Sequence, residues 1–216
     1  MNKYLKELVL WAFIALPYAY LATIWNELPE KVPIHFNMDG VANGWASKSS
    51  LLFIPGVLGI GIYLLMAIIP VLDPKKKIQQ MEGKYYNLRF LLTIFISLLA
   101  TYTLYMSKTG SLKNPNMLFG LIGVLFAMLG NYFQTVRPNY FIGIRTPWAL
   151  ENEQVWRRTH RLGGRLWTAG GVLIAILAII ISNQQLFFLI FCSIVFVMVI
   201  VPVIFSYSDF KKIRNT

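Results

Sequence analysis

The sequence has 216 residues, of which 56% are hydrophobic and only 13% are charged. Long uncharged apolar runs carry this excess, which excludes an ordinary soluble domain and predicts an integral membrane protein. The net charge of +11 does not indicate direct nucleic-acid binding, because the basic residues fall in short segments between apolar runs, where they set membrane orientation.

Six apolar runs are long enough for membrane-spanning helices. Most hold about 20 residues, which is ~30 Å of helix and matches the hydrocarbon core of a bilayer. We therefore predict an all-α fold, a polytopic six-helix transmembrane bundle. The expected spans are 5–25, 51–72, 88–106, 117–136, 166–181 and 186–205.

The expected spans fall into two parts. Residues 1–87 hold the first two helices and an extracytoplasmic loop at 26–50, and residues 88–216 hold four helices and a cytoplasmic loop at 137–165. With both termini in the cytoplasm, 16 of the 20 Lys and Arg residues lie on the inner side. This asymmetry predicts a multi-pass protein of the cell membrane with cytoplasmic ends.

The outer loop is richer in aromatic residues than a plain connector. Val32–Phe36 favours a short strand, and Asp39-Gly40 and Asn43-Gly44 are typical turn dipeptides. An aromatic belt at the membrane interface explains Trp45 about as well as a binding surface does. The candidate peptide- or ligand-binding residues are His35, Phe36, Asn37, Met38, Gly40 and Trp45.

The inner loop combines arginines, tryptophans and a histidine. Thr146-Pro147 is typical of a helix start, and Asn152 is a candidate cap for a second helix. That second helix has an aromatic and apolar side and a basic side, which predicts an amphipathic basic helix at the cytoplasmic membrane surface. An interfacial anchor and a binding role both remain open for it. Small residues also predict close helix packing. They are Gly171 and Ala175 in the 166–181 span, and four small residues in the 117–136 span.

Neither metal nor catalytic chemistry is indicated. The two histidines, His35 and His160, are expected on opposite sides of the membrane, and neither has a Cys or a second His at ligand spacing. Known hydrolase, metalloprotease and phosphate-binding motifs are absent from the sequence. We therefore expect no metal, no cofactor and no enzymatic activity.

The inner stretch NYFIGIRTPWALENEQVWRRTHRLGG resembles the signature of the SdpI family of bacterial immunity membrane proteins. That signature joins an N-x-x-x-G-I-R-T-P-W segment to a V-W-x-x-T-H-R helix. The outer stretch LPEKVPIHFNMDGVANGWASK resembles the small domain of unknown function that precedes this segment in many members, with Asn43 where an aspartate is expected.

The resemblance implies protection of the cell against a secreted antimicrobial peptide toxin. In some members it also implies sensing of the toxin and sequestration of a cytoplasmic transcriptional repressor. A non-catalytic membrane scaffold that binds anionic lipid headgroups, or a small-molecule or lipid transporter, is the alternative. The inner-loop residues with a partner-binding or structural role are Asn139, Gly143, Arg145, Thr146, Pro147, Trp148, Trp156, Thr159, His160 and Arg161.

Overall fold

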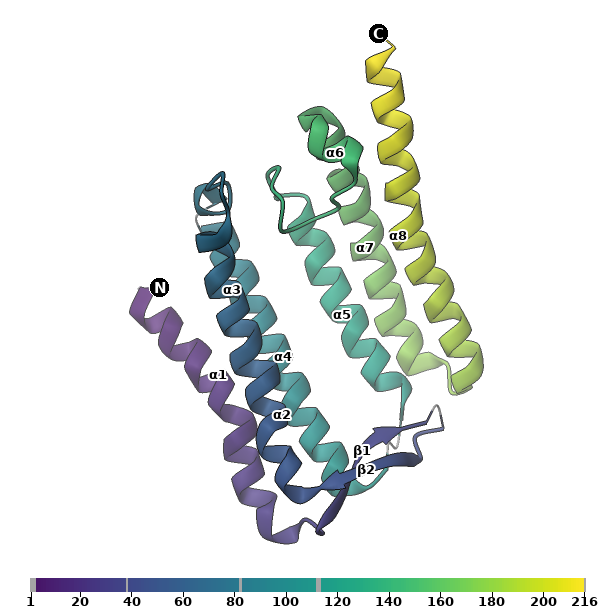
Figure 1. Ribbon diagram of the computed structural model, residues 1–216. Helices are drawn as coiled ribbons and strands as arrows, with labels where there is room; N and C mark the ends of the chain where they lie inside the picture. The colour runs from purple at the N-terminus through teal and green to yellow at the C-terminus, as the bar shows by residue number, and fades with distance from the viewer. Residues whose placement is uncertain (1–2, 38, 82, 112–113, 216) are drawn as a thin grey trace. The chain divides into compact units, whose positions relative to one another are not determined.

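The computed structural model describes residues 3–37, 39–81, 83–111 and 114–215, and it is almost wholly helical (Figure 1). Within these residues, six helical segments are long and apolar enough to cross a membrane, which confirms the predicted fold class. The chain packs as two compact units. The first comprises Met1–Leu72 with Tyr85–Asn114, and the second comprises Asp73–Lys84 with Pro115–Thr216. The division at residue 87 that the sequence suggested stays a prediction.

Three spans belong to the first unit. They are α1 (Lys3–Ile24), α3 (Gly61–Leu72) with the irregular turns that lead into it, and α4 (Gly83–Thr109), of which the unit takes all but the first two residues. The lead-in to α3 passes through a 3₁₀ turn at Lys48–Leu52, the short α2 (Phe53–Pro55) and a π-helical turn at Gly56–Ile60. Proline and glycine are the residues that weaken an α-helix most, and Pro55 and Gly56 stand where the helix is irregular.

An antiparallel hairpin connects α1 to the second span. Its strands are β1 (Lys31–Phe36) and β2 (Ala42–Ser47), so the predicted strand at Val32–Phe36 is confirmed. The turn at Asp39-Gly40 is confirmed as well, since Gly40 has a φ of +76°, which glycine adopts without steric cost.

The second predicted turn, at Asn43-Gly44, is wrong. Gly44 lies within β2 opposite His35, and a Cβ on Gly44 would come within 2.8 Å of the His35 Cβ. The chain has already reversed before this point, because the Asn37 side chain closes the turn. Its Oδ1 accepts hydrogen bonds from the backbone N–H of Asp39 (3.1 Å) and of Val41 (2.8 Å). Gly44 is therefore needed for close strand approach rather than for a turn.

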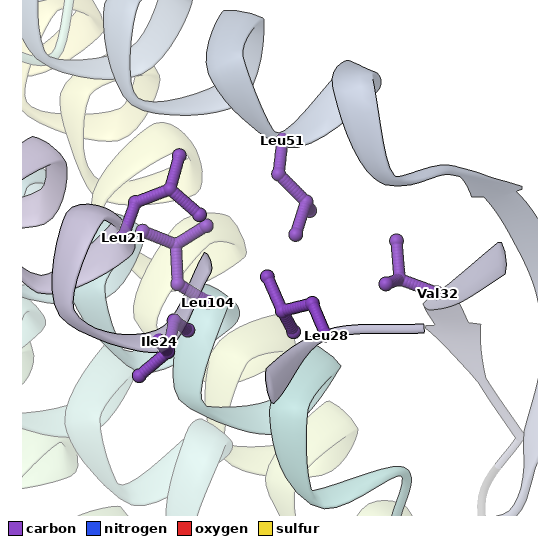
Figure 2. Close-up of a cluster of buried hydrophobic side chains, with 6 residues drawn as sticks. All are labelled: Leu21, Ile24, Leu28, Val32, Leu51 and Leu104. Atoms are coloured by element: carbon purple, nitrogen blue, oxygen red, sulfur yellow. The ribbon is translucent and has the colours of Figure 1, made fainter. Parts of the chain in front are cut away.

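A buried apolar cluster attaches the hairpin to the helices of the first unit. Figure 2 shows its side chains, which come from α1, the hairpin, the start of the second span and α4. Leu28 and Val32 lie outside the long helices, and burial of each from water contributes about 1.5–3 kcal/mol. In addition, the Ser107 hydroxyl in α4 donates to the Pro33 carbonyl over 2.9 Å. The cluster consists of Leu21, Ile24, Leu28, Val32, Leu51 and Leu104.

An ion pair joins two helices of the first unit. Arg89 in α4 lies 3.1 Å from Glu7 in α1, and the Tyr63 hydroxyl donates to the same carboxylate over 2.9 Å. The pairing satisfies both charges at the end of a bundle of apolar helices, where an unpaired charge is costly.

The second unit contains three long helices that lie side by side (Figure 1). They are α5 (Asn116–Phe133), α7 (Glu153–Ile180) and α8 (Gln184–Arg214), and the short α6 (Pro147–Glu151) precedes α7. The predicted basic helix and the fifth span form one continuous helix. At 28 residues, α7 is ~42 Å long and exceeds a ~30 Å hydrocarbon core, so its basic first turns extend beyond the apolar part.

Small residues allow α5 and α7 to pack closely, as the sequence predicted. A Cβ on Gly123 would lie 2.7 Å from the Gly171 carbonyl oxygen, and one on Gly130 would lie 2.7 Å from the Gly164 carbonyl oxygen. Backbones this close leave no room for a side chain, so these glycines fix the spacing of the two helices.

The orientation of the helices in the membrane is a prediction. In a Cys192→Ser background, a cysteine at Glu30 should react with an impermeant thiol reagent added to whole cells. Cysteines at Gln154 and Lys211 should react only after the membrane is opened, because positive segments stay on the cytoplasmic side. All three positions are exposed. Labelling of the cysteine at Gln154 from outside would contradict this orientation and indicate the opposite one.

Candidate functional site

The loop that follows α5 is held on the first turns of α7 by two buried side chains. The Trp156 indole N–H donates to the Val136 carbonyl over 2.9 Å, and His160 Nε2 accepts the Ile144 backbone N–H over 2.9 Å. Trp156 is 0% exposed and His160 is 2% exposed. The two contacts attach both ends of the loop to one helix.

The hydrogen bonds of His160 define its protonation state. Its Nδ1 lies 2.9 Å from the Trp156 carbonyl oxygen, which can only accept, so Nδ1 carries the proton. Its Nε2 accepts an N–H and is therefore unprotonated. The ring is a neutral imidazole, and it stacks on the Trp156 ring with a centroid separation of 4.0 Å. A buried neutral histidine with both nitrogens bonded is a structural bridge.

Asn139 and Gly143 shape the loop between these two attachment points. The Asn139 side chain, 3% exposed, accepts from the N–H of Phe141 and Ile142 and donates to the carbonyls of Arg137 and Ile142. Gly143 has a φ of +109°, and a Cβ there would overlap His160 Nε2. The asparagine and the glycine are therefore required by the loop's own geometry.

The helix starts predicted in this region are confirmed. The Thr146 hydroxyl accepts from the Ala149 N–H at the start of α6, where Pro147 occupies the first helical position. Asn152 caps α7 by accepting from two backbone N–H groups. Trp148 packs edge-on against Tyr207 of α8, with ring centroids 5.0 Å apart, so the turn through α6 is attached to α8.

The remaining predicted inner-loop residues differ in burial. Arg145 donates to the Tyr140 carbonyl, as expected for an arginine in a turn-rich loop, but its side chain is exposed. Thr159 is fully buried. Arg161 is exposed and borders a cavity. His160, rather than Arg145, fixes the loop against α7.

The cavity beside this loop is basic. It has a volume of about 550 Å³ and lies between the segment before α4, the end of α5 and the first turns of α7. Glu153 is the only carboxylate among its described lining residues, and it is 2.7 Å from Arg157. Five cations line it, namely Lys77, Lys84, Arg137, Arg157 and Arg161. We call these residues and this space the basic pocket.

The segment that supplies Lys77 is itself ordered by hydrogen bonds. Asp73, 3% exposed, accepts the N–H of Ile78 over 2.7 Å and that of Lys75 over 3.2 Å. Lys75 Nζ donates to the Tyr140 hydroxyl over 3.0 Å. This hydrogen bond lowers the pKa of Tyr140 below its ordinary value and connects the segment to the loop after α5.

The outer-loop candidates occupy the first unit and are not part of the basic pocket. His35 Nδ1 lies 2.5 Å from Asn43 Oδ1 across the hairpin. Asn37 and Gly40 form the turn, and Met38 lies outside the described residues. Phe36 is half-buried, whereas Trp45 is 57% exposed. Trp45 is therefore available to a ligand, and His35 is exposed as well.

Several residues of the site had no clear signal in the sequence. Arg158 forms an ion pair with the buried Asp209 of α8 over 3.0 Å, an interaction between residues 51 positions apart. The need for glycine at position 163 also had no signal in the sequence. A Cβ there would overlap the Ile144 side chain. From the sequence, Lys77 and Arg137 contribute only to the positive charge that sets membrane orientation, and their place in the lining of the basic pocket was not predicted. Within the described residues, no group of three His, Cys, Asp or Glu side chains is placed to hold a metal ion.

Comparisons with known proteins match both motif regions. Residues 135–206 match the model of the SdpI/YfhL protein family, and residues 12–59 match a domain of unknown function, DUF1648. The resemblance to the SdpI family is confirmed. The immunity protein SdpI of Bacillus subtilis (strain 168) is 25% identical over 212 residues, covering 98% of this chain and 99% of that protein. No solved structure matches the chain. This chain is a multi-pass membrane protein similar to an immunity protein.

The segment that matches the SdpI/YfhL family model thus contains the loop contacts described above, and Gly143 offers a direct test of them. Gly143→Ala should lower the free energy of unfolding by about 2–4 kcal/mol, because the left-handed backbone costs ~1–2 kcal/mol and displacement of His160 leaves a buried N–H unpaired. Thermal unfolding in detergent measures the loss.

Gly61→Ala in α3 is the matched control. Gly61 has a φ of −59°, and no neighbouring segment comes within 4 Å of the position that a Cβ would take there. Alanine should be neutral at this position or stabilise by about 0.5–1 kcal/mol. Equal stability of Gly143→Ala and the wild type would contradict the described loop geometry.

Proposed function

We propose that this protein protects the cell that makes it against a secreted peptide toxin, and that the β1–β2 hairpin binds the peptide. The observation that carries the proposal is a set of exposed apolar side chains on a fixed hairpin. Trp45 is 57% exposed, Val41 59% and Ile34 44%. Exposed apolar groups gathered on one surface element are typical of interaction sites.

The hairpin is suited to binding because it is held in place before a ligand arrives. Val32 is completely buried in the cluster of Figure 2, and Pro33 is bonded to Ser107 of α4. Lys48 N–H also donates to the Glu30 carbonyl over 2.9 Å at the open end of the hairpin. A preorganised surface loses less conformational entropy on binding, and aromatic anchors contribute most to affinity.

The full-length similarity to an immunity protein supports the same proposal. Protection by binding rather than by catalysis agrees with the chemistry of the hairpin. His35 contacts the neutral amide of Asn43, and this pair contains no hydroxyl or thiol nucleophile for the histidine to activate. With the charge asymmetry of the sequence, the hairpin lies on the extracytoplasmic side and meets the toxin first.

A second role is favoured by the basic turns of α7. Arg157, Arg161 and Arg165 are exposed on a helix whose start is fixed by Trp156 and His160. On the cytoplasmic side, such a rigid cationic surface can hold a partner protein. We infer that sensing of the toxin and sequestration of a cytoplasmic repressor, where they occur, use this surface.

A toxin-challenge survival assay tests the first proposal. Trp45→Ala should weaken binding of the toxin by more than ~1 kcal/mol, about fivefold, because an aromatic anchor is lost. Survival should fall accordingly at equal protein level. Trp45→Phe is the control, since a residue that serves only as an interfacial anchor tolerates this exchange without loss. Full protection by Trp45→Ala contradicts the proposal.

Exchange of the hairpin tests specificity. Residues 29–47 are replaced by the same segment of a relative that resists a different peptide. The exchanged protein should protect against the second peptide and lose protection against the first. If resistance remains with the helices and the inner loop, the hairpin is not the binding element.

A further inference from the structure

A second, more open cavity adjoins the basic pocket, and most of its exposed lining is apolar. It has a volume of about 670 Å³ and lies along α5 and α7 within the second unit. Gln134, at the end of α5, lines both cavities, so the two are neighbours. The α7 side chains along it are Arg165, Thr168, Ala169, Val172, Leu173 and Ile176. We call this second cavity the apolar groove.

From the basic pocket to the apolar groove, the lining side chains change from cationic to apolar. The basic pocket presents Lys77, Lys84, Arg137 and Arg161, in addition to the Arg157 that is paired with Glu153. Arg165 lines the groove one helical turn after Arg161 of the basic pocket. Further along α7, Val172 and Ile176 are apolar and exposed. An anionic group therefore fits one end and a hydrocarbon chain fits the other.

The length of the groove matches one leaflet of a membrane. Arg165 and Ile176 are 11 positions apart on α7, which is ~16 Å of helix, close to half of a ~30 Å hydrocarbon core. Ala169 lies between these two positions on α7 and is an exposed lining residue of the groove.

We propose that the second unit binds one anionic glycerophospholipid, with its phosphate in the basic pocket and an acyl chain in the apolar groove. A free phosphate or an acidic peptide would use the pocket alone and leave the groove empty. Arginine and lysine bind phosphate oxygens through charge-assisted hydrogen bonds. The bound lipid connects the segment before α4 with α5 and α7. This site is independent of toxin binding by the hairpin, but it shares Arg157, Arg161 and Arg165 with the cationic surface proposed above for a partner protein.

Native mass spectrometry of the full-length protein in neutral detergent tests the site, with phosphatidylglycerol and phosphatidylcholine as probes. Phosphatidylglycerol should bind more tightly. Arg137→Gln combined with Arg161→Gln should weaken its binding about 25-fold, since each cation near an anionic headgroup contributes roughly a factor of five. Each single variant should lose about a factor of five, which keeps the test available if the double variant is unstable.

Lys211→Gln combined with Arg214→Gln is the matched control. It removes the same charge from exposed positions in the last turn of α8 and should leave phosphatidylglycerol binding unchanged. Equal losses in the two double variants would assign the effect to overall charge and overturn the proposal. Equal binding of phosphatidylcholine and phosphatidylglycerol would overturn it too.

The groove is tested separately with Ala169→Trp, which fills it. This variant should weaken phosphatidylglycerol binding while millimolar binding of glycerol phosphate, followed by calorimetry, stays the same. The thermal unfolding midpoint verifies the fold. Unchanged phosphatidylglycerol binding in Ala169→Trp means a headgroup-only site, and the proposal fails. It also fails if glycerol phosphate, or an oligoglutamate peptide, binds as tightly as phosphatidylglycerol.

Discussion

The second unit depends on the bridge that the neutral imidazole of His160 forms between α7 and the loop before α6. One ring nitrogen donates to the helix carbonyl of Trp156, and the other accepts the loop N–H of Ile144. The Trp156 carbonyl keeps its helical hydrogen bond without the ring, whereas the partly buried Ile144 N–H would lose its partner, at a cost of about 1–3 kcal/mol. The left-handed Gly143 and the side chain of Asn139 are arranged around this bridge.

The bridge also has a consequence for electrostatics. Together with the Trp156–Val136 hydrogen bond it fixes the loop so that Arg137 and Arg161 line one cavity, although they are 24 positions apart in the sequence. Gathering like charges is unfavourable in the absence of an anion, and packing of the neutral aromatic pair Trp156 and His160 opposes this repulsion. The first unit follows the same rule at its hairpin, where buried Val32 holds exposed Trp45 in place. In both units a buried apolar contact positions the groups that are available to a ligand.

Local patterns predicted much of this structure, and long-range contacts account for what they missed. The six spans, the caps at Thr146 and Asn152, and the small-residue contact of α5 with α7 each follow from residues close in sequence or one helical turn apart. The turn at Asn43-Gly44 was mispredicted because Asn37 closes the hairpin earlier. The pairs Arg89–Glu7 and Arg158–Asp209 join residues 82 and 51 positions apart. Nothing local distinguishes these charges from those that set topology, and the same holds for the cations of the basic pocket.

The protonation state of His160 is the most direct measure of this account. The chain has two histidines, so selective ¹⁵N labelling of histidine in the detergent-solubilised protein gives a simple spectrum, and a His35→Gln variant assigns it. At neutral pH His160 should be the neutral tautomer with the proton on Nδ1 and with Nε2 as an acceptor. A proton on Nε2, or a doubly protonated ring, would contradict the bridge, because the Ile144 N–H would then face another N–H.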